Sequence, residues 1–277
     1  MKFTKQLLIL LAIVQLSLVA TSQNQVFTTQ DSLRGSITAE RAWWDLTFYH
    51  LDIKVSLPDS SFEGTNKISY KVLAPSQLMQ IDLQKPMQIT RVSQDGKNLD
   101  FERAGNAWFI KLLKKQNTGD HNEIIVGFGG KPQVSKRPPW SGGVSWKKDD
   151  NQNPFIVTTC QGDGASLWWP CKDHQYDEPD STLISVTVPE KLTDVSNGRL
   201  RSVVQNPDHT QTFTWFVSQP INNYCVNLNI ADYVHFAEKY KGEKGLLDCD
   251  YYVLSYNLAK AQQQFREEWI ARMPSSA

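Results

Sequence analysis

The sequence predicts an all-β protein, an antiparallel β-sandwich with one short helix near its C-terminal end. Three observations support this fold class. Thirteen Pro and fifteen Gly residues, together with 9 Trp, 9 Tyr and 12 Phe, favour strands joined by turns over a helical bundle. Short segments of alternating apolar and polar residues recur along the chain without helical patterns between them. Apolar residues recur with a helical period only near the C-terminus.

The clearest strand covers residues 48–57, where every second residue is apolar and the residues between are polar. A period of two buries one face of a strand and exposes the other. Ile68, Tyr70 and Val72 repeat this pattern after a turn at residues 58–64, so the two segments are expected to pair as neighbouring antiparallel strands. By the same criterion, further strands are predicted at residues 88–93, 107–111, 123–128, 155–159, 183–188, 199–204, 212–217, 224–230, 233–240 and 250–256.

Two segments depart from the strand pattern. Residues 129–143 contain several prolines and a Gly142-Gly143 pair, which cannot maintain a hydrogen-bonded ladder, so an extended loop is predicted. Residues 258–273 combine apolar and charged positions with a helical period and are followed by Pro274, which predicts an amphipathic helix. A helix at the end of a sandwich suggests that a further part of the protein follows.

Composition and charge exclude some functions. The 29 basic and 29 acidic residues give a net charge of zero, so the basic footprint of a nucleic-acid binder is missing and no nucleic-acid partner is expected. Lysines precede an apolar run at residues 7–20, a pattern typical of a secretory signal peptide, and the run is shorter than a membrane span requires. We therefore expect a secreted or periplasmic protein without a permanent membrane anchor. The expected division is a signal peptide at 1–22, a flexible segment at 23–40, the sandwich at 41–257 and the start of a linker helix at 258–277.

The four cysteines lie in the part of the chain expected to be exported, where two disulfides could form. The sequence does not choose among the three connectivities, and free buried thiols are an equal alternative. No close C-x-x-C pair is present, so a structural zinc site is not expected. The four residues are Cys160, Cys171, Cys225 and Cys249.

The most unusual segment covers residues 158–181, T-T-C-Q-G-D-G-A-S-L-W-W-P-C-K-D-H-Q-Y-D-E-P-D-S. It combines glycines, two adjacent tryptophans and several ionisable residues, a composition common in functional loops. Its acidic residues fit no calcium-loop spacing, so capping of turns is the favoured interpretation over metal binding. Trp168 and Trp169 are predicted to be core aromatics, with a carbohydrate-stacking platform as the alternative.

This segment resembles the signature of the N-terminal domain of the aminopeptidase N family of zinc metallopeptidases. The similarity is carried by C-Q at residues 160–161, W-P-C-K-D at 169–173 and D-E-P at 177–179. Trp43-Trp44-Asp45, Tyr49-His50-Leu51 and Phe62-Glu63-Gly64 resemble the opening strands of that family, and Lys131-Pro132 and R-P-P-W at 137–140 resemble its bacterial secreted members. The resemblance extends from about residue 42 to about residue 265.

The resemblance implies a saddle-shaped β-sandwich that covers one side of a separate thermolysin-like catalytic domain. It also implies that Gln161 reaches the active-site cleft and helps to shape the pocket for the first side chain of a peptide substrate. An amide that both donates and accepts hydrogen bonds suits this task. Without the resemblance, Gln161 would be interpreted as an ordinary glutamine at the end of a strand.

The chemistry of the family requires zinc, which is held by an H-E-x-x-H motif and a distant glutamate. None of the five histidines in this sequence belongs to such a motif, and the G-x-M-E-N type motif that binds the substrate amine is missing too. We therefore expect no catalytic residue, metal ligand or cofactor in this chain, with zinc in the intact family member. The favoured hypothesis is a truncated N-terminal domain of an exported aminopeptidase, inactive alone; the alternative is a secreted β-sandwich that binds a glycan or a protein.

Overall fold

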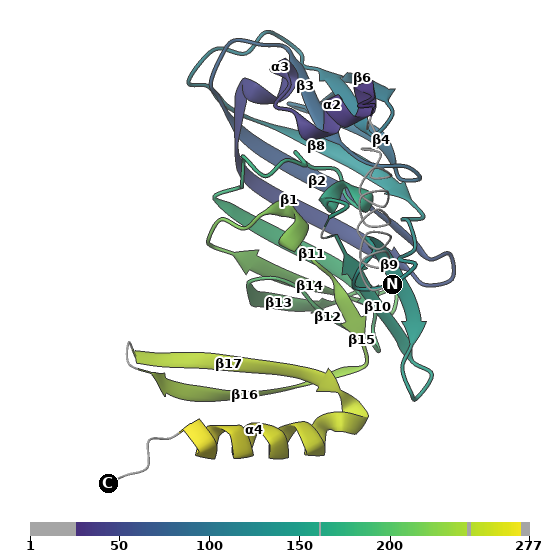
Figure 1. Cartoon of the computed structure of the whole chain (residues 1–277), viewed down its shortest axis with the longest axis vertical. Helices are drawn as coiled ribbons and strands as arrows, with labels where there is room; N and C mark the ends of the chain where they lie inside the picture. The colour runs from purple at the N-terminus through teal and green to yellow at the C-terminus, as the bar shows by residue number, and fades with distance from the viewer. Residues whose placement is uncertain (1–25, 161, 243–244, 273–277) are drawn as a thin grey trace, which may run out of the picture.

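The computed structural model describes residues 26–160, 162–242 and 245–272, with side chains described as far as Phe265. Most of the described chain forms strands, which confirms the predicted all-β sandwich with a C-terminal helix (Figure 1). One large sheet has the strand order β13-β14-β11-β1-β2-β8-β4-β5. Smaller sheets have the orders β12-β15-β10-β9 and β3-β7-β6, and β16 pairs with β17.

The large sheet is formed by β1 (Trp44–Ser56), β2 (Ser61–Val72), β4 (Gln88–Gln94), β5 (Lys97–Asn98), β8 (His121–Gly130), β11 (Ser181–Pro189), β13 (Arg199–Gln205) and β14 (Thr210–Val217). The other strands are β3 (Leu78–Asp82), β6 (Asp100–Ala104), β7 (Ala107–Lys111), β9 (Gly143–Lys148), β10 (Pro154–Thr159), β12 (Thr193–Val195), β15 (Asn229–Ala231), β16 (Tyr233–Gly242) and β17 (Gly245–Leu254). The helical segments are α2 (Thr29–Gly35), α3 (Ala39–Ala42), α4 (Leu258–Arg272), η1 (Ala165–Leu167), η2 (Asn223–Cys225) and η3 (Ser255–Asn257).

Strand β1 lies in the middle of the large sheet, and its side chains alternate as the sequence predicts. Tyr49, Leu51 and Ile53 are completely buried, whereas Asp52 and Lys54 between them are exposed. β1 pairs antiparallel with β2, as expected, but parallel with β11. The parallel pair departs from the expected purely antiparallel arrangement, because strands that are distant in the sequence can be joined by a long crossover connection.

Two details of the predicted strands are corrected. The strand predicted at residues 224–230 is instead the short helix η2 followed by an irregular segment, and only residues 229–231 pair as β15. Asn222 caps η2 by accepting a hydrogen bond from the backbone of Tyr224, which explains why this segment leaves the strand conformation. β3, β5, β6, β9 and β12 were not predicted. In β3, Gln80 and Asp82 are polar although they are buried.

The predicted loop at residues 129–143 is largely confirmed. Its first two residues complete β8 and its last residue begins β9, while the residues between are irregular apart from a bridge from Val134 to Val144. Trp140, in this loop, is 79% exposed.

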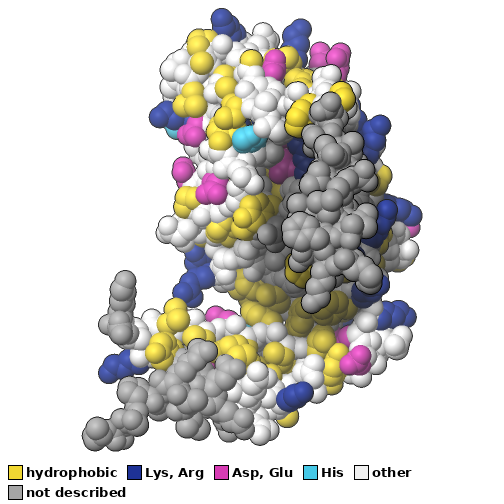
Figure 2. Space-filling model, viewed as in Figure 1, with side chains coloured by type: hydrophobic (Ala, Val, Ile, Leu, Met, Phe, Trp, Pro, Cys, Tyr) yellow, Lys and Arg dark blue, Asp and Glu magenta, His cyan; other side chains and the backbone are white. Residues whose placement is uncertain are grey.

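The predicted C-terminal helix is confirmed as α4, which lies beside the β16–β17 hairpin at one end of the molecule (Figure 1). Phe265 of α4 contacts Tyr251 of the hairpin, with ring centroids 4.2 Å apart, and Phe236 at 6.0 Å. Figure 2 shows hydrophobic side chains gathered over this hairpin, where Leu246 and Leu247 are exposed. Within the described ranges, we find no helix with the length and apolarity needed to span a membrane.

Two short helices, α2 and α3, occupy part of the segment that the sequence suggests is flexible. A capping box forms between Thr28 and Asp31 at the start of α2. Gln30 then hydrogen-bonds to the β6–β7 turn, donating to the carbonyl of Ala104 and accepting from the backbone N–H of Asn106. These contacts attach α2 to the sandwich.

One carboxyl group lies entirely within the core. Asp194 of β12 is completely buried, and its Oδ2 accepts a hydrogen bond of 3.0 Å from Trp215 Nε1. Its other oxygen has no hydrogen-bond partner among the described residues. Burial raises the pKa of Asp194 well above its usual range, because apolar surroundings disfavour the charged carboxylate.

Candidate functional site

The signature segment connects β10 to β11 and packs its two tryptophans into the core. Trp168 and Trp169 are both completely buried. Trp168 contacts Phe62 with ring centroids 6.0 Å apart, and Trp169 contacts Tyr49 at 5.1 Å. A carbohydrate-stacking platform needs an exposed ring face, so these residues are core aromatics, as the favoured interpretation predicts.

Asp173 holds the turn that precedes η1. Its carboxylate accepts hydrogen bonds from the backbone N–H groups of Ala165 and Ser166 and from the Ser166 hydroxyl, at 3.2, 3.1 and 2.5 Å. Gly164 has φ +88°, and a Cβ at this position would lie 2.2 Å from Asp173 Oδ2. The turn therefore requires glycine, both for its backbone conformation and for the close approach of the carboxylate.

A buried ion pair joins the short helix α3 to strand β3, beside the signature segment. Arg41 Nη2 donates to Asp82 Oδ2 at 2.5 Å, and both side chains are almost completely removed from water. Asp82 also accepts hydrogen bonds of 3.1 Å from Gln80 Nε2 and from the backbone N–H of Asp173. Burial raises the pKa of Asp82 to about 6, and the Arg41 guanidinium opposes this increase. The hydrogen bond from the Asp173 N–H to Asp82 links the signature segment to β3.

Lys172 and Asp177 form a second buried ion pair, with side-chain exposures of 0% and 7%. Lys172 Nζ also donates to the carbonyl of Trp44 at 2.6 Å and lies 4.0 Å from the centre of the Trp44 ring. Asp177 accepts from the backbone N–H of Leu46. Burial lowers the pKa of Lys172 to about 8, with the charge of Asp177 opposing that shift. Lys172 and Asp177 of the signature segment therefore have structural partners within the fold.

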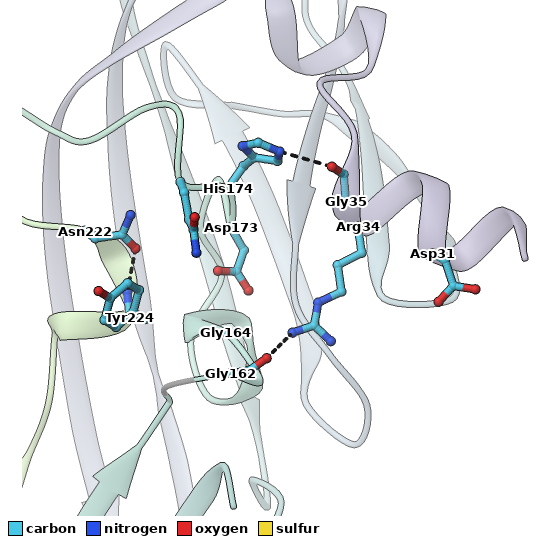
Figure 3. A pocket seen from close by; sticks show the side chains of 10 residues that line it. Asp31, Arg34, Gly35, Gly162, Gly164, Asp173, His174, Asn222 and Tyr224 are labelled. Atoms are coloured by element: carbon cyan, nitrogen blue, oxygen red, sulfur yellow. Dashed lines mark hydrogen bonds between the residues drawn. The ribbon is translucent and has the colours of Figure 1, made fainter. Parts of the chain in front are cut away.

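A pocket of about 510 Å³ lies on the outer side of this turn (Figure 3). One wall comes from α2, another from the turn and the residues after Asp173, and a third from η2. The pocket is bordered by Asp31, Arg34, Gly35, Gly162, Gly164, Asp173, His174, Gln175, Asn222 and Tyr224.

The polar groups in this pocket are largely held by hydrogen bonds to the backbone. Arg34 Nη2 donates to the carbonyls of Gly162 and Asp163, and His174 Nε2 lies 3.3 Å from the carbonyl oxygen of Gly35 (Figure 3). Tyr224 of η2 is 40% exposed. The pocket therefore presents the guanidinium of Arg34, the imidazole of His174 and the phenol of Tyr224. These groups surround a turn that the Asp173 carboxylate holds in place.

Gln161, the predicted substrate-binding residue, lies outside the described residues. Its neighbour Gly162 borders the pocket. The role of Gln161 therefore stays a prediction.

The histidines do not form a metal site. His50 lies beside Ser185, His209 beside Glu190 and His235 beside Asp250, in separate parts of the fold. Across residues 26–160, 162–242 and 245–272, no group of three or more histidine, cysteine or acidic side chains could hold a metal ion. The donor set of the described residues thus does not fit zinc.

The four cysteines are free thiols in the structure. Cys160 and Cys171 are buried, Cys225 is exposed and Cys249 is partly buried. Cys160 Sγ accepts a hydrogen bond of 3.0 Å from Trp168 Nε1, and burial raises the pKa of the Cys160 thiol to about 12. The buried pair behaves as small apolar residues, which is the second of the two alternatives left open by the sequence.

Comparison with known protein families shows which family has this fold and signature segment. The model of the peptidase M1 N-terminal domain matches residues 46–225, which include the whole signature segment. The chain belongs to the peptidase M1 N-terminal domain family. This M1 domain assignment confirms the resemblance to the N-terminal domain of zinc aminopeptidases.

Solved structures share the fold of this M1 domain. An M1 zinc metallopeptidase from Deinococcus radiodurans, bound to a Tyr-Ser-Ala substrate, has a TM-score of 0.67 and 14% identity, covering 78% of this chain and 49% of that chain. A two-domain M1 zinc metallopeptidase bound to L-arginine gives the same TM-score with 16% identity, covering 78% and 48%. The chain thus spans about half the length of these metallopeptidases.

A curated relative shares a shorter stretch with the M1 domain. Subunit 2 of the transcription initiation factor TFIID from Drosophila melanogaster is 29% identical over 89 residues, which is 32% of this chain and 7% of that protein.

Several residues of the site were not identified from the sequence of this M1 domain. Arg34 lies in the segment expected to be flexible, Arg41 is the first residue of the expected sandwich, and Asp82 lies in a strand that was not predicted. The Thr28 and Asp31 spacing, a capping-box pattern, is the signal that could have located α2 and with it Arg34. Tyr224 was assigned to a strand and gave no indication of lining a pocket.

Proposed function

We propose that this chain is the non-catalytic N-terminal domain of an exported zinc aminopeptidase and that it shapes one wall of the substrate cleft. The match to the M1 N-terminal domain model supports this role. The intact enzyme would remove N-terminal residues from peptides. In this proposal residues 41–257 are the sandwich, and residues 258–277 begin the connection to a catalytic domain.

The observation that carries the proposal is the pocket at the signature turn. The turn at residues 162–164 borders a pocket of about 510 Å³ and is backed by the Asp173 carboxylate. Gln161 directly precedes this turn, and its amide can both donate and accept hydrogen bonds. We propose that Gln161 contributes to selection of the first substrate side chain and takes no part in bond breaking.

The other chemical components of the reaction are expected from the rest of the enzyme. The described residues do not fit zinc, and the sequence contains neither H-E-x-x-H nor a motif for the substrate amine. The D. radiodurans metallopeptidase binds a Tyr-Ser-Ala substrate, which supports a peptide substrate for the intact parent of this chain.

Export is proposed from the N-terminal sequence. Residues 1–22 have the charged start and apolar run of a signal peptide and lie outside the described residues. Mass spectrometry of protein recovered outside the cytoplasm should give a chain that begins near residue 23. An uncleaved N-terminus in a cytoplasmic fraction would contradict export.

The domain role is tested at the level of the gene and then of the enzyme. Translation of the encoding DNA beyond residue 265, in each frame, should supply H-E-x-x-H. In the chain joined to that segment, Gln161→Ala should change the ratio of kcat/KM between aminoacyl substrates while the zinc content stays constant. If no frame encodes the motif, or if Gln161→Ala leaves the ratio unchanged, the proposed role of this domain or of Gln161 fails.

The alternative function, a secreted module that binds a glycan or a protein, is favoured by one observation. Trp140 is 79% exposed in the loop before β9, and an exposed tryptophan ring can stack on a sugar or insert into a partner. Titration with oligosaccharides, followed by tryptophan fluorescence in the wild type and in Trp140→Ala, tests the glycan form of this alternative. A saturable change that Trp140→Ala abolishes would support it, and no change would oppose it.

A further inference from the structure

The N-terminal helix α2 forms one wall of the pocket, and its position is fixed from several sides. Gln30 holds its first turn on the β6–β7 turn. Gln80 Nε2 donates to the carbonyl of Leu33 at 3.1 Å, and Arg41 Nη1 donates to the carbonyl of Arg34 at 3.2 Å. These contacts come from separate elements of the sandwich, so α2 presents Arg34 at a defined place.

Arg34 makes its hydrogen bonds to the turn that borders the pocket. Its Nη2 donates to the carbonyl of Asp163 at 2.5 Å. The same nitrogen lies 3.4 Å from the carbonyl oxygen of Gly162, a contact that Figure 3 shows. Two successive carbonyl oxygens that point toward the same place repel one another. A guanidinium between them removes that repulsion and favours this conformation of the turn.

The turn needs such a contact because its backbone is unusual. Gly162 has φ +86° and Gly164 has φ +88°. Glycine adopts positive φ readily, but it populates negative φ as readily, so other contacts must select this conformation. The N–H groups of Asp163 and Gly164 both donate to the carbonyl of Cys160, at 3.0 and 2.8 Å. The turn is thus closed on its inner side by Cys160 and held on its outer side by Arg34.

Asp163 connects this turn to two further elements. Its carbonyl also accepts a hydrogen bond of 2.7 Å from Gln84 Nε2, and its carboxylate accepts one of 2.6 Å from the backbone N–H of Gly142. Gln84 approaches the turn from the end of β3, and Gly142 belongs to the loop before β9. Among the partners of the Asp163 carbonyl, Arg34 supplies the positive charge.

Arg34 itself is exposed, and a hydrogen bond made by an exposed side chain contributes little to global stability. Its effect is therefore expected at the turn. We propose that Arg34 is a positioning residue, presented by α2, which fixes the turn at residues 162–164 and thereby sets the shape of the pocket. The consequence for substrate selection rests on the proposed function, whereas the positioning does not.

The experiment uses the full chain labelled with ¹⁵N-glycine, without peptide. The amide of Gly164 reports on the closed turn, while Gly96 and Gly119 report on turns elsewhere whose Cβ positions face open space among the described atoms. In Arg34→Met, exchange of the Gly164 amide should be about 10-fold faster, the effect of losing one charge-assisted hydrogen bond. Exchange at Gly96 and Gly119 and the urea midpoint should stay unchanged.

Two further variants make the outcome specific. Arg34→Lys keeps a cation that can donate to the Asp163 carbonyl and should restore most of the protection of Gly164. Arg91→Met removes an exposed arginine from β4 and should leave Gly164 unchanged. The proposal is overturned if Gly164 in Arg34→Met exchanges within about twofold of the wild type. It is also overturned if all glycines exchange faster together, because this would show a global loss of stability. Since no substrate is present, failure of the aminopeptidase proposal would not alter this result.

Discussion

Replacement of Lys172 by methionine should destabilise the protein strongly, because it leaves the carboxylate of Asp177 buried without its cation. The side chains are 0% and 7% exposed, so water cannot replace the lost partner. Removal of one member of a buried ion pair costs about 3 to 5 kcal/mol. Loss of the contact between Nζ and the Trp44 ring, 4.0 Å from the ring centre, acts in the same direction. Since a domain has about 5 to 15 kcal/mol of stability, the variant should lose a large fraction of it.

The free energy of unfolding is measured by urea denaturation, with the fluorescence of the buried tryptophans as the signal. The double variant Lys172→Met/Asp177→Asn removes both charges but keeps an acceptor for the backbone N–H of Leu46, so it should recover about half of the loss or more. Lys54→Met is the matched control, because Lys54 pairs with Asp208 at the surface and its loss should cost less than about 1 kcal/mol. If Lys172→Met is no more harmful than Lys54→Met, or if the double variant recovers nothing, the buried pair does not stabilise the signature segment.

Three further predictions concern the turn, the core and the cysteines. Gly164→Ala should lower the free energy of unfolding by about 2 to 4 kcal/mol, because it combines a positive φ with displacement of the Asp173 carboxylate. Gly162→Ala has no described atom near its Cβ position and should lower it by about 1 kcal/mol. Equal losses in urea denaturation would contradict this difference. The pKa of Asp194 is higher in the folded state than in the unfolded state, so the wild type should lose stability as the pH rises above about 4. The loss should be about 1.4 kcal/mol per pH unit up to the folded pKa. Asp194→Asn should not show this pH-dependent loss. Urea denaturation of both proteins at pH 5 and pH 7 checks this, and parallel pH profiles would refute it. Iodoacetamide at pH 8 should modify Cys225 in the native protein and Cys160 only after unfolding, as followed by peptide mass spectrometry, and rapid native modification of Cys160 would contradict its burial.

The sequence predicts those elements whose alternation is regular. β1 and β14 alternate buried and less buried residues along their length, and the predicted strand at residues 107–111 agrees with β7 at both ends. β3 was missed because its buried positions include Gln80 and Asp82, whose burial depends on partners that arrive from distant parts of the chain, such as Arg41. A local pattern cannot indicate that a polar side chain will meet a buried partner.

The candidate site, too, could be predicted from the sequence only where the signal is local. The glycines and acidic residues of the signature segment indicate a functional loop, and the family resemblance indicates where that loop lies. The contribution of α2 could not be derived, because Arg34 precedes the turn that it contacts by more than a hundred residues. The strand predicted at residues 224–230 was wrong at its start, since the capping hydrogen bond of Asn222 places Tyr224 in a helical turn beside the pocket.

The central claim is that this chain is an M1 N-terminal domain and, as we propose, the non-catalytic part of a zinc aminopeptidase. The most direct measurement is an assay of the purified chain against aminoacyl chromogenic substrates, with added zinc and then with a chelator. The account predicts no turnover in either condition, because the described residues offer no zinc ligand set. Zinc-dependent turnover that the chelator abolishes would contradict it.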